Sequence, residues 1–242
     1  ENYDFSKNKK FTGKIIRINE NNSIRKFNMK TIVLFGDSIT DMGHWRDADT
    51  HAFSFGVGYP LFLKEKIERN NLDIQILNRG CSGDSTTNLL ERIDEDVIKN
   101  NPDIVTILIG TNDVWHQFEG DETHRGNQIE QYENNYREII NIIKTKLPKT
   151  KILMFGSFFI PLKQPERKDF WNHMKKLYLY VDVAEKIAIE NSIPFIRLQS
   201  LMDEAIKDGN VEKVLYDGIH PNVNGSLIIA DVVFEEILKY IK

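Results

Sequence analysis

The stretch Thr31-Ile-Val-Leu-Phe35, followed at once by Gly36-Asp37-Ser38-Ile39-Thr40, decides the fold that this sequence predicts. An apolar run that ends in a glycine is typical of a buried strand leading into a tight turn. Ser38 would then leave the sheet at the end of a strand, where open α/β folds place their ligands. Four more apolar runs predict further strands: Ile74–Leu77, Ile104–Ile109, Ile152–Gly156 and Phe195–Leu198.

Longer amphipathic segments stand between and after these runs: Tyr59–Arg69, Thr87–Lys99, Ile129–Lys146, Trp171–Glu190 and Gly225–Ile241. Their apolar residues recur at helical spacing, which indicates helices that bury one face against a core. Alternating strands and helices are typical of βα units. The chain is therefore predicted to be an α/β protein, with α/β/α layers around a mostly parallel five-stranded sheet.

Composition narrows the classes of protein to which the chain can belong. Its 242 residues, 40% hydrophobic and 28% charged, suit one globular domain. Residues 1–28 lack the periodicity of a core, so we expect an N-terminal lead-in arm and one domain over residues 29–242. A formal net charge of -4 provides no concentrated basic face, so neither nucleic acid nor an anionic membrane is expected as a partner.

Cysteine content and hydropathy bear on the compartment. The single cysteine, Cys81, cannot form an internal disulfide, which suits the cytoplasm. No stretch is long and uncharged enough to span a bilayer, so no membrane association is expected. A secretion leader removed before the first residue would leave no trace, so this sequence leaves secretion open.

Four short motifs carry the residues suited to chemistry. They are Gly36-Asp-Ser-Ile-Thr40, Asn78-Arg-Gly80, Gly110-Thr-Asn-Asp113 and Asp217-Gly-Ile-His220-Pro221. A serine at the end of a strand, with an Asp-x-x-His pair late in the chain, supplies the nucleophile, base and orienting carboxylate of an acyl-transfer enzyme. Taken singly, each motif is also an ordinary turn or helix cap. The combination, with each motif at a strand exit or in a late loop, favours catalysis.

In these motifs the chain resembles the GDSL-type esterases of the SGNH hydrolase superfamily. The four residues that name the superfamily have the counterparts Ser38, Gly80, Asn112 and His220. The resemblance extends from about Lys30 to the C-terminus and implies a flavodoxin-like three-layer fold. The Gly-x-Ser-x-Gly elbow of the α/β-hydrolases is absent from the sequence.

The resemblance also implies a mechanism. Ser38 would attack an ester carbonyl and form an acyl-enzyme, His220 would act as general base and acid, and Asp217 would orient the imidazole. The oxyanion would be bound by the backbone N–H groups of Ser38 and Gly80 and by the side-chain amide of Asn112. This chemistry needs no cofactor and no metal, and the other histidines lack the spacing of metal ligands.

Several neighbouring residues are expected to have other roles. Asp37 and Asp113 should bind backbone N–H groups and hold their loops, and Asp37 is also expected among the substrate contacts. Trp115 and Tyr59 are the other predicted substrate contacts, as aromatic platforms for a sugar ring. Cys81 is interpreted as a small apolar residue rather than a thiol nucleophile.

The substrate class follows from a closer resemblance. Gly56-Val-Gly-Tyr59, Asn78-Arg-Gly-Cys-Ser-Gly83 and Gly110-Thr-Asn-Asp-Val-Trp115 resemble the bacterial subgroup that contains acetylxylan and xylo-oligosaccharide acetyl esterases. The resemblance implies removal of short acyl groups, especially acetyl, from carbohydrates. Some members of the subgroup form homo-oligomers, and this sequence leaves the oligomeric state open.

Two alternatives remain at this point. A lysophospholipase or acyl-thioesterase of the same superfamily would need an apolar channel. Six residues could line it: Phe53, Phe55, Phe118, Phe158, Phe159 and Ile160. A non-catalytic module that binds a glycan or a protein could keep this fold but would usually lack a catalytic side chain. The sugar, the acetylated hydroxyl and the limit on acyl length depend on loop geometry, which the sequence leaves open.

Overall fold

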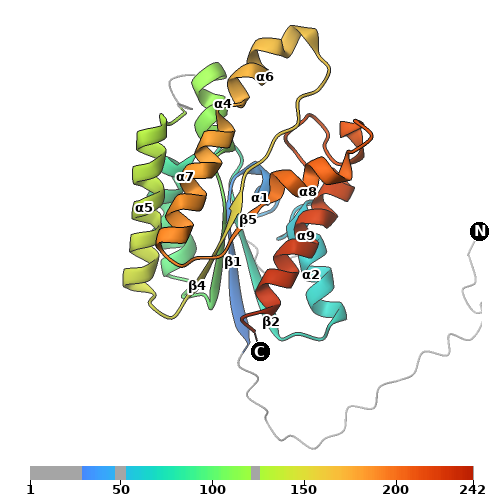
Figure 1. Cartoon of the computed structure of the whole chain (residues 1–242). Helices are drawn as coiled ribbons and strands as arrows, with labels where there is room; N and C mark the ends of the chain where they lie inside the picture. Colours follow the sequence, from blue (N-terminus) through green and yellow to red (C-terminus); the bar gives the residue numbers. More distant parts are fainter. Residues whose placement is uncertain (1–28, 47–52, 121–125, 242) are drawn as a thin grey trace, which may run out of the picture.

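A computed structural model describes residues 29–46, 53–120 and 126–241; the arm expected over residues 1–28 lies outside them. Five parallel strands form one sheet in the order β2-β1-β3-β4-β5 (Figure 1). The strands are β1 (Lys30–Gly36), β2 (Ile74–Gly80), β3 (Ile104–Leu108), β4 (Lys151–Gly156) and β5 (Phe195–Arg197). The predicted α/β fold is confirmed, and each predicted strand overlaps an observed one.

Helices cover both faces of the sheet. Those of the described residues are α1 (Ser38–Asp41), α2 (Tyr59–Arg69), α3 (Thr86–Ile93), α4 (Thr111–Glu119), α5 (Ile129–Lys146), α6 (Lys168–Met174), α7 (Leu177–Glu190), α8 (Leu198–Ala205) and α9 (Val223–Leu238). In Figure 1, α5 and α7 lie on one side of the sheet, and α2, α8 and α9 lie on the other. Within the described ranges, every helix is too short or too polar to cross a bilayer.

The central strand β1 shows why this sequence produces two cores. Successive side chains of a strand point to opposite faces, so Val33 and Phe35 pack with α3, α5 and α7. Ile32 and Leu34 pack with α2, α8 and α9 on the other face. All four side chains are fully buried. A strand covered on both faces reads as a continuous apolar run, and this is the run that decided the fold.

Two of the predicted helices differ from the observed ones. The segment predicted as one helix over Thr87–Lys99 is α3 followed by a π-helical turn over Asp94–Ile98. This wider turn contains Asp96, which is almost fully buried and is bound by the side chains of Arg46 and Arg92. The helix predicted over Trp171–Glu190 is divided into α6 and α7 by a turn at Lys175 and Lys176.

The short helices α1, α4 and α8 are not predicted by the sequence, because each is too short for apolar periodicity to reveal it. α1 follows β1 and α4 follows β3, so both begin at the carboxyl edge of the sheet. α4 and α6 lie beyond this edge at the top of Figure 1. The fold therefore brings the expected chemical residues to one edge of the sheet, as open α/β folds do.

Close packing at Gly80 is a testable consequence of this arrangement. A Cβ on Gly80 would collide with backbone atoms of Thr40 and Asp41, which cannot move without displacing α1. We expect Gly80→Ala to lower the free energy of unfolding by about 1–3 kcal/mol, measured by urea denaturation. Gly156→Ala is the control, since its Cβ would meet side-chain atoms of Val181 and Phe195 that can yield. Equal losses in the two variants would contradict this interpretation.

Candidate active site

Ser38, His220 and Asp217 form a hydrogen-bonded chain at the carboxyl edge of the sheet. Ser38 Oγ lies 2.9 Å from His220 Nε2, and His220 Nδ1 lies 2.7 Å from Asp217 Oδ2. A ring nitrogen beside a carboxylate carries the proton, so Nδ1–H donates to Asp217 and Nε2 accepts from the Ser38 hydroxyl. The structure therefore brings together the three residues expected to act as nucleophile, base and orienting carboxylate.

The Asp-x-x-His spacing works because the loop folds back on its own carboxylate. Asp217 Oδ1 accepts hydrogen bonds from the backbone N–H groups of Ile219, at 2.9 Å, and His220, at 2.7 Å. The other oxygen, Oδ2, accepts from the imidazole. The loop is held from outside by the N–H of Ile160, which donates to the carbonyl of Gly218 at 2.8 Å. One carboxylate thus sets both the loop conformation and the ring orientation.

Electrostatics keep Asp217 ionised and make His220 a stronger base. Burial opposes ionisation of Asp217, but hydrogen bonds from the His220 ring and backbone outweigh it and lower the pKa of the carboxyl to about 2. The hydrogen bond to Asp217 raises the pKa of His220 above its ordinary 6.5, against the opposing effect of burial. Asp217 is therefore ionised whenever His220 is neutral and able to take a proton.

Asn112 and Ser38 each lie in the first turn of a helix. The N–H groups of a first helical turn have no acceptor within their own helix, so the Ser38 N–H at the start of α1 can serve a ligand. Asn112 is the second residue of α4, and its Nδ2 donates to the carbonyl of Asp84 at 2.9 Å. A side-chain amide has two hydrogens, so the second remains for an oxyanion.

Gly80 does not suit the role of oxyanion donor expected for it. Its N–H donates to Asn78 Oδ1 at 2.9 Å, inside the packed end of β2. Three residues later, Gly83 has a φ of 86° at the third position of the turn Cys81–Asp84, which the Asp84 N–H closes by donating to the Cys81 carbonyl at 3.2 Å. In the described part of the chain, the Gly83 N–H has no hydrogen-bond partner. The geometry therefore favours Gly83 over Gly80 as the second backbone donor.

Arg92, which sequence reasoning did not single out, holds the loops that carry these donors. Its guanidinium donates to the carbonyl of Gly36 at 2.8 Å, the carbonyl of Arg79 at 2.8 Å and the carboxylate of Asp84 at 2.6 Å. It also stacks 4.6 Å from the centroid of the Phe35 ring. The sequence holds no local signal for this role, since an arginine on a predicted amphipathic helix is typical of a solvated surface.

Asp113 and Asp37 are buried and hold their loops. Asp113 accepts hydrogen bonds from the N–H and the hydroxyl of Thr86 and from the side chain of Asn127. Asp37 Oδ1 accepts from the N–H of Ile39 and so caps α1. Asp37 is 1% exposed, so its expected contact with substrate is corrected: the side chain points into the protein.

Of the two aromatic platforms, only Trp115 lies beside the triad. Its ring centroid is 6.3 Å from that of His220. Tyr59 is 1% exposed and its hydroxyl bonds Thr40 Oγ1 at 3.2 Å, so it packs under α1 and cannot offer a face to a sugar. The expectation for Tyr59 is therefore corrected. The start of an amphipathic helix suggests an accessible surface, whereas this ring is part of the core.

α6 and the residue before it, Arg167, add side chains to the Trp115 side of the site that the sequence did not indicate. Phe170 packs edge-on against Trp115, with ring centroids 5.1 Å apart. The guanidinium of Arg167 lies 4.1 Å from the Phe170 centroid and 5.9 Å from that of Trp115. Cationic groups over aromatic faces are attracted by the ring quadrupole. Trp115 and Phe170 therefore form an aromatic cluster next to His220, with the positive charge of Arg167 over their rings.

Neither a thiol nor a metal centre competes with this site among the described residues. Burial raises the pKa of the Cys81 thiol, which disfavours the thiolate that a nucleophile needs. Across residues 29–46, 53–120 and 126–241, no three His, Cys, Asp or Glu side chains gather as a metal-binding group.

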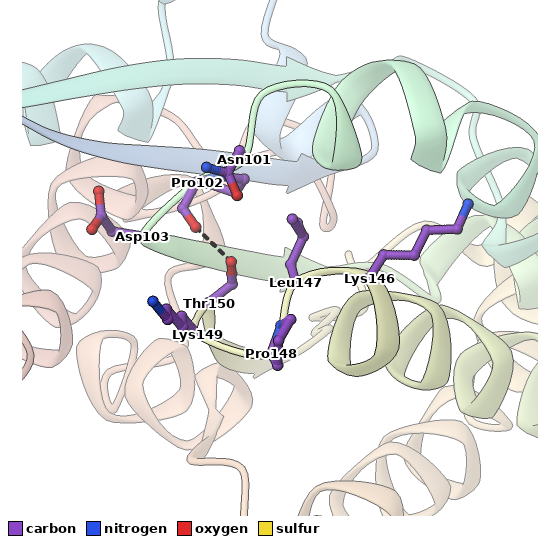
Figure 2. A pocket seen from close by; sticks show the side chains of 8 residues that line it. All are labelled: Asn101, Pro102, Asp103, Lys146, Leu147, Pro148, Lys149 and Thr150. Atoms are coloured by element: carbon purple, nitrogen blue, oxygen red, sulfur yellow. Dashed lines mark hydrogen bonds between the residues drawn. The ribbon is translucent and has the colours of Figure 1, made fainter.

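A separate hollow lies at the opposite edge of the sheet (Figure 2). The loops before β3 and β4 line it with residues 101–103 and 146–150, and Thr150 Oγ1 bonds the carbonyl of Pro102 across it at 2.6 Å. This edge holds the amino ends of β3 and β4, whereas the triad lies at the carboxyl ends. None of the expected site residues lines this hollow, so it is not the site of the proposed chemistry.

Comparison with known proteins identifies relatives across most of the chain. Residues 34–228 match the model of the GDSL-like lipase/acylhydrolase family. An acetylxylan esterase from Geobacillus stearothermophilus is 30% identical over 212 residues, which are 85% of this chain and 93% of that protein. An arylesterase from Vibrio mimicus is 22% identical over 183 residues, 76% of this chain and 80% of that protein.

Solved structures agree with these sequence relatives. The crystal structure of the Geobacillus acetylxylan esterase is 29% identical, with a TM-score of 0.74, and the match covers 86% of this chain and 94% of that one. Other crystal structures are of catalytic mutants of that esterase, in which an Asp, a Ser or a His is replaced by Ala. In that protein the replaced Asp and His are three positions apart.

The hydrogen bond from Asp217 predicts how activity depends on pH. His220 must be neutral to accept a proton, so kcat/KM for ester hydrolysis should rise with pH through a pKa above 6.5. In Asp217→Asn the bond that raises the pKa is weakened, so this limb should move to lower pH while kcat falls by at least about 10²-fold. A pH–rate profile measures both, and an unmoved limb in Asp217→Asn would contradict the assigned pairing.

Burial of Asp37 predicts a pH-dependent stability. Burial is the main cause that raises the pKa of this carboxyl from 3.8 to about 7 in the folded protein. Between pH 3.8 and about 7, Asp37 is protonated in the folded protein and ionised in the unfolded chain. The free energy of unfolding therefore falls as pH rises through this range. Asp37→Asn cannot ionise, so its stability relative to wild type should be greater at about pH 8 than at about pH 4.5 in urea denaturation. A difference independent of pH would exclude a buried, titrating Asp37.

Proposed function

This chain belongs to the GDSL-like lipase/acylhydrolase family, and on that premise we propose that it is a serine esterase that removes acetyl groups from carbohydrates such as xylo-oligosaccharides. The observation that carries the proposal is the chain of hydrogen bonds from Ser38 Oγ to His220, at 2.9 Å, and from His220 to Asp217, at 2.7 Å. The catalytic mutants of the Geobacillus esterase replace the same three residue types, with the same Asp-x-x-His spacing.

The first half of the proposed reaction forms an acyl-enzyme. Ser38 Oγ attacks the ester carbonyl carbon while its proton passes to His220 Nε2, which gives a tetrahedral oxyanion. His220 then passes this proton to the oxygen of the leaving sugar hydroxyl, the bond from that oxygen to the carbonyl carbon breaks, and the acetyl group remains on Ser38. Asp217 stabilises the imidazolium during both transfers.

The second half releases acetate. A water molecule gives a proton to His220 Nε2 as its oxygen attacks the acetyl carbonyl, and a second tetrahedral oxyanion forms. When this intermediate collapses, His220 returns the proton to Ser38 Oγ and acetic acid leaves, ionising in solution. The same residue therefore serves as base and acid in turn.

Three donors are proposed for the oxyanion in both halves: the N–H groups of Ser38 and Gly83 and the side-chain amide of Asn112. Asn112 and the Gly83 turn are joined through the hydrogen bond from Asn112 Nδ2 to the carbonyl of Asp84. Donors that are fixed before the reaction need not reorganise as charge develops on the oxyanion. Such electrostatic stabilisation of the transition state is the largest contribution to the rate acceleration in many enzymes.

A short acyl group and a sugar leaving group fit the surroundings of the triad. Of the residues that could line a channel for a long chain, Phe158, Phe159 and Ile160 are buried in the core, whereas Phe53 and Phe118 are exposed. Trp115 lies beside His220, where it can stack on a sugar ring. These observations favour the acetyl esterase over a lysophospholipase or thioesterase. The intact triad disfavours a non-catalytic binding module.

Release of acetate from acetylated xylo-oligosaccharides tests the proposal. Wild type should release acetate and should hydrolyse p-nitrophenyl acetate faster than p-nitrophenyl octanoate. Ser38→Ala should lower kcat by a factor of about 10⁴ or more, since it removes the nucleophile. Ser200→Ala is the matched control, because the hydroxyl of this exposed serine on α8 bonds the carbonyl of Arg197, away from the triad.

The outcomes separate the alternatives. Activity on octanoate but not on the sugar would overturn the carbohydrate assignment and leave the serine mechanism standing. Activity that survives in Ser38→Ala would overturn the mechanism. A wild type inactive on every ester would favour the binding module.

A further inference from the structure

The carboxylate of Asp41, at the end of α1, joins two parts of the proposed site. Asp41 Oδ2 accepts hydrogen bonds from the N–H of Ser82, at 2.9 Å, and from its hydroxyl, at 2.5 Å. Oδ1 accepts from the N–H of His44, at 3.1 Å, and from His44 Nδ1, at 2.7 Å. A carboxylate has about four lone-pair sites, so these four bonds satisfy it fully.

Among the described residues, the His44 ring contacts this carboxylate through Nδ1. Its side chain is 2% exposed, and its second ring nitrogen, Nε2, is buried and has no hydrogen-bond partner among the described residues. The bond from Nδ1 to Asp41, at 2.7 Å, holds the carboxylate in a single orientation.

The described residues therefore contain two Asp-x-x-His loops, which differ in whether the second ring nitrogen of the histidine reaches a reactive group. In both pairs the carboxylate accepts from the histidine N–H and from its Nδ1. In the pair Asp217 and His220, Nε2 emerges at Ser38 Oγ and can move a proton. In the pair Asp41 and His44, Nε2 is buried, and the free face of the carboxylate is turned to Ser82 instead.

The contact between Asp41 and Ser82 bears on the oxyanion hole because of where Ser82 lies in the chain. Ser82 is exposed and directly precedes Gly83 in the turn Cys81–Asp84. The ends of this turn are held by the Cys81 N–H on the carbonyl of Gly36 and by Asn112 on the carbonyl of Asp84. Among the contacts that the structure describes, Asp41 supplies the hydrogen bonds that hold Ser82 at the middle of the turn.

We propose that Asp41 is a positioning residue for the oxyanion hole, which holds the turn bearing the Gly83 N–H against the helix bearing the Ser38 N–H. Ser38 and Asp41 are the first and last residues of α1, so one turn of helix links the nucleophile to the contact. The proposal rests on the proposed function. It gives Asp41, His44 and Ser82 one shared role, because together they keep two backbone donors that are distant in sequence at a constant separation while charge develops on the oxyanion.

The proposal is tested with Asp41→Asn, Ser82→Ala and the double variant, using kcat and KM for p-nitrophenyl acetate. An amide in place of the carboxylate must face either Ser82 or His44 with its NH₂ group, so the backbone N–H of that residue loses its acceptor. We expect kcat to fall about 10- to 100-fold in Asp41→Asn, with KM nearly unchanged, because the oxyanion forms only in the transition state. Ser82→Ala should lower kcat less, and the double variant should be no slower than Asp41→Asn alone.

Asp103→Asn is the matched control. Asp103 accepts from the N–H of Thr31 at 2.9 Å and from Lys30 at 2.8 Å, at the opposite edge of the sheet. It should lower the melting temperature without lowering kcat. Equal kcat in wild type and Asp41→Asn, or additive losses in the double variant, would overturn the proposal. Ser82→Ala, at an exposed position, keeps the test available if Asp41→Asn does not fold.

Hydrogen exchange separates this proposal from the proposed function. The amide of Ser82, which donates to Asp41 in wild type, should exchange faster in Asp41→Asn, whichever reaction the protein performs. Unchanged exchange would overturn the proposed contact even if the protein is an active esterase. Faster exchange in a protein whose hydrolysis survives Ser38→Ala would support the contact, remove its catalytic role, and overturn the proposed function instead.

Discussion

The guanidinium of Arg92 is the interaction on which the geometry of the site depends. It binds the carbonyls of Gly36 and Arg79, so the ends of β1 and β2 share one partner, and it binds the carboxylates of Asp84 and Asp96. A charge largely withdrawn from water needs hydrogen bonds in its place, and for the partly buried Arg92 they are supplied by strand ends and loops. The need to solvate one cation therefore sets where the turns after two strands can lie.

Three carboxylates also hold the loops at the carboxyl edge of the sheet. Asp113 binds the start of α3, Asp37 caps α1, and Asp41 binds the middle of the turn between β2 and α3. Burial raises the pKa values of Asp37, to about 7, and Asp113, to about 6, whereas hydrogen bonds lower that of Asp41, to about 2, against the opposing effect of its partial burial. The hydrogen bonds that these carboxylates accept hold their loops in one conformation. The site is thus organised before a substrate arrives.

The sequence by itself determined the fold and the membership of the candidate triad. Apolar runs and helical spacing depend on local periodicity, which a single sequence displays, so each of the five strands could be predicted close to its observed position. Asp217 and His220 are three positions apart, and a short loop can fold a carboxylate under a ring without help from elsewhere. Local spacing was therefore sufficient for this pair.

Only the tertiary structure decided which glycine offers its N–H, which aromatic ring lies open, and what holds the loops. Gly80 and Gly83 are equally flexible in sequence, and the hydrogen bond to Asn78 occupies one of them. Tyr59 stands at a predicted helix start, yet its ring is buried and its hydroxyl bonds Thr40 of α1.

The contacts that hold the loops join residues far apart in the sequence. Arg92 and Gly36 are 56 positions apart, and Asp41 and Ser82 are 41 apart. Contacts over such separations arise from chain packing, for which local periodicity carries no signal.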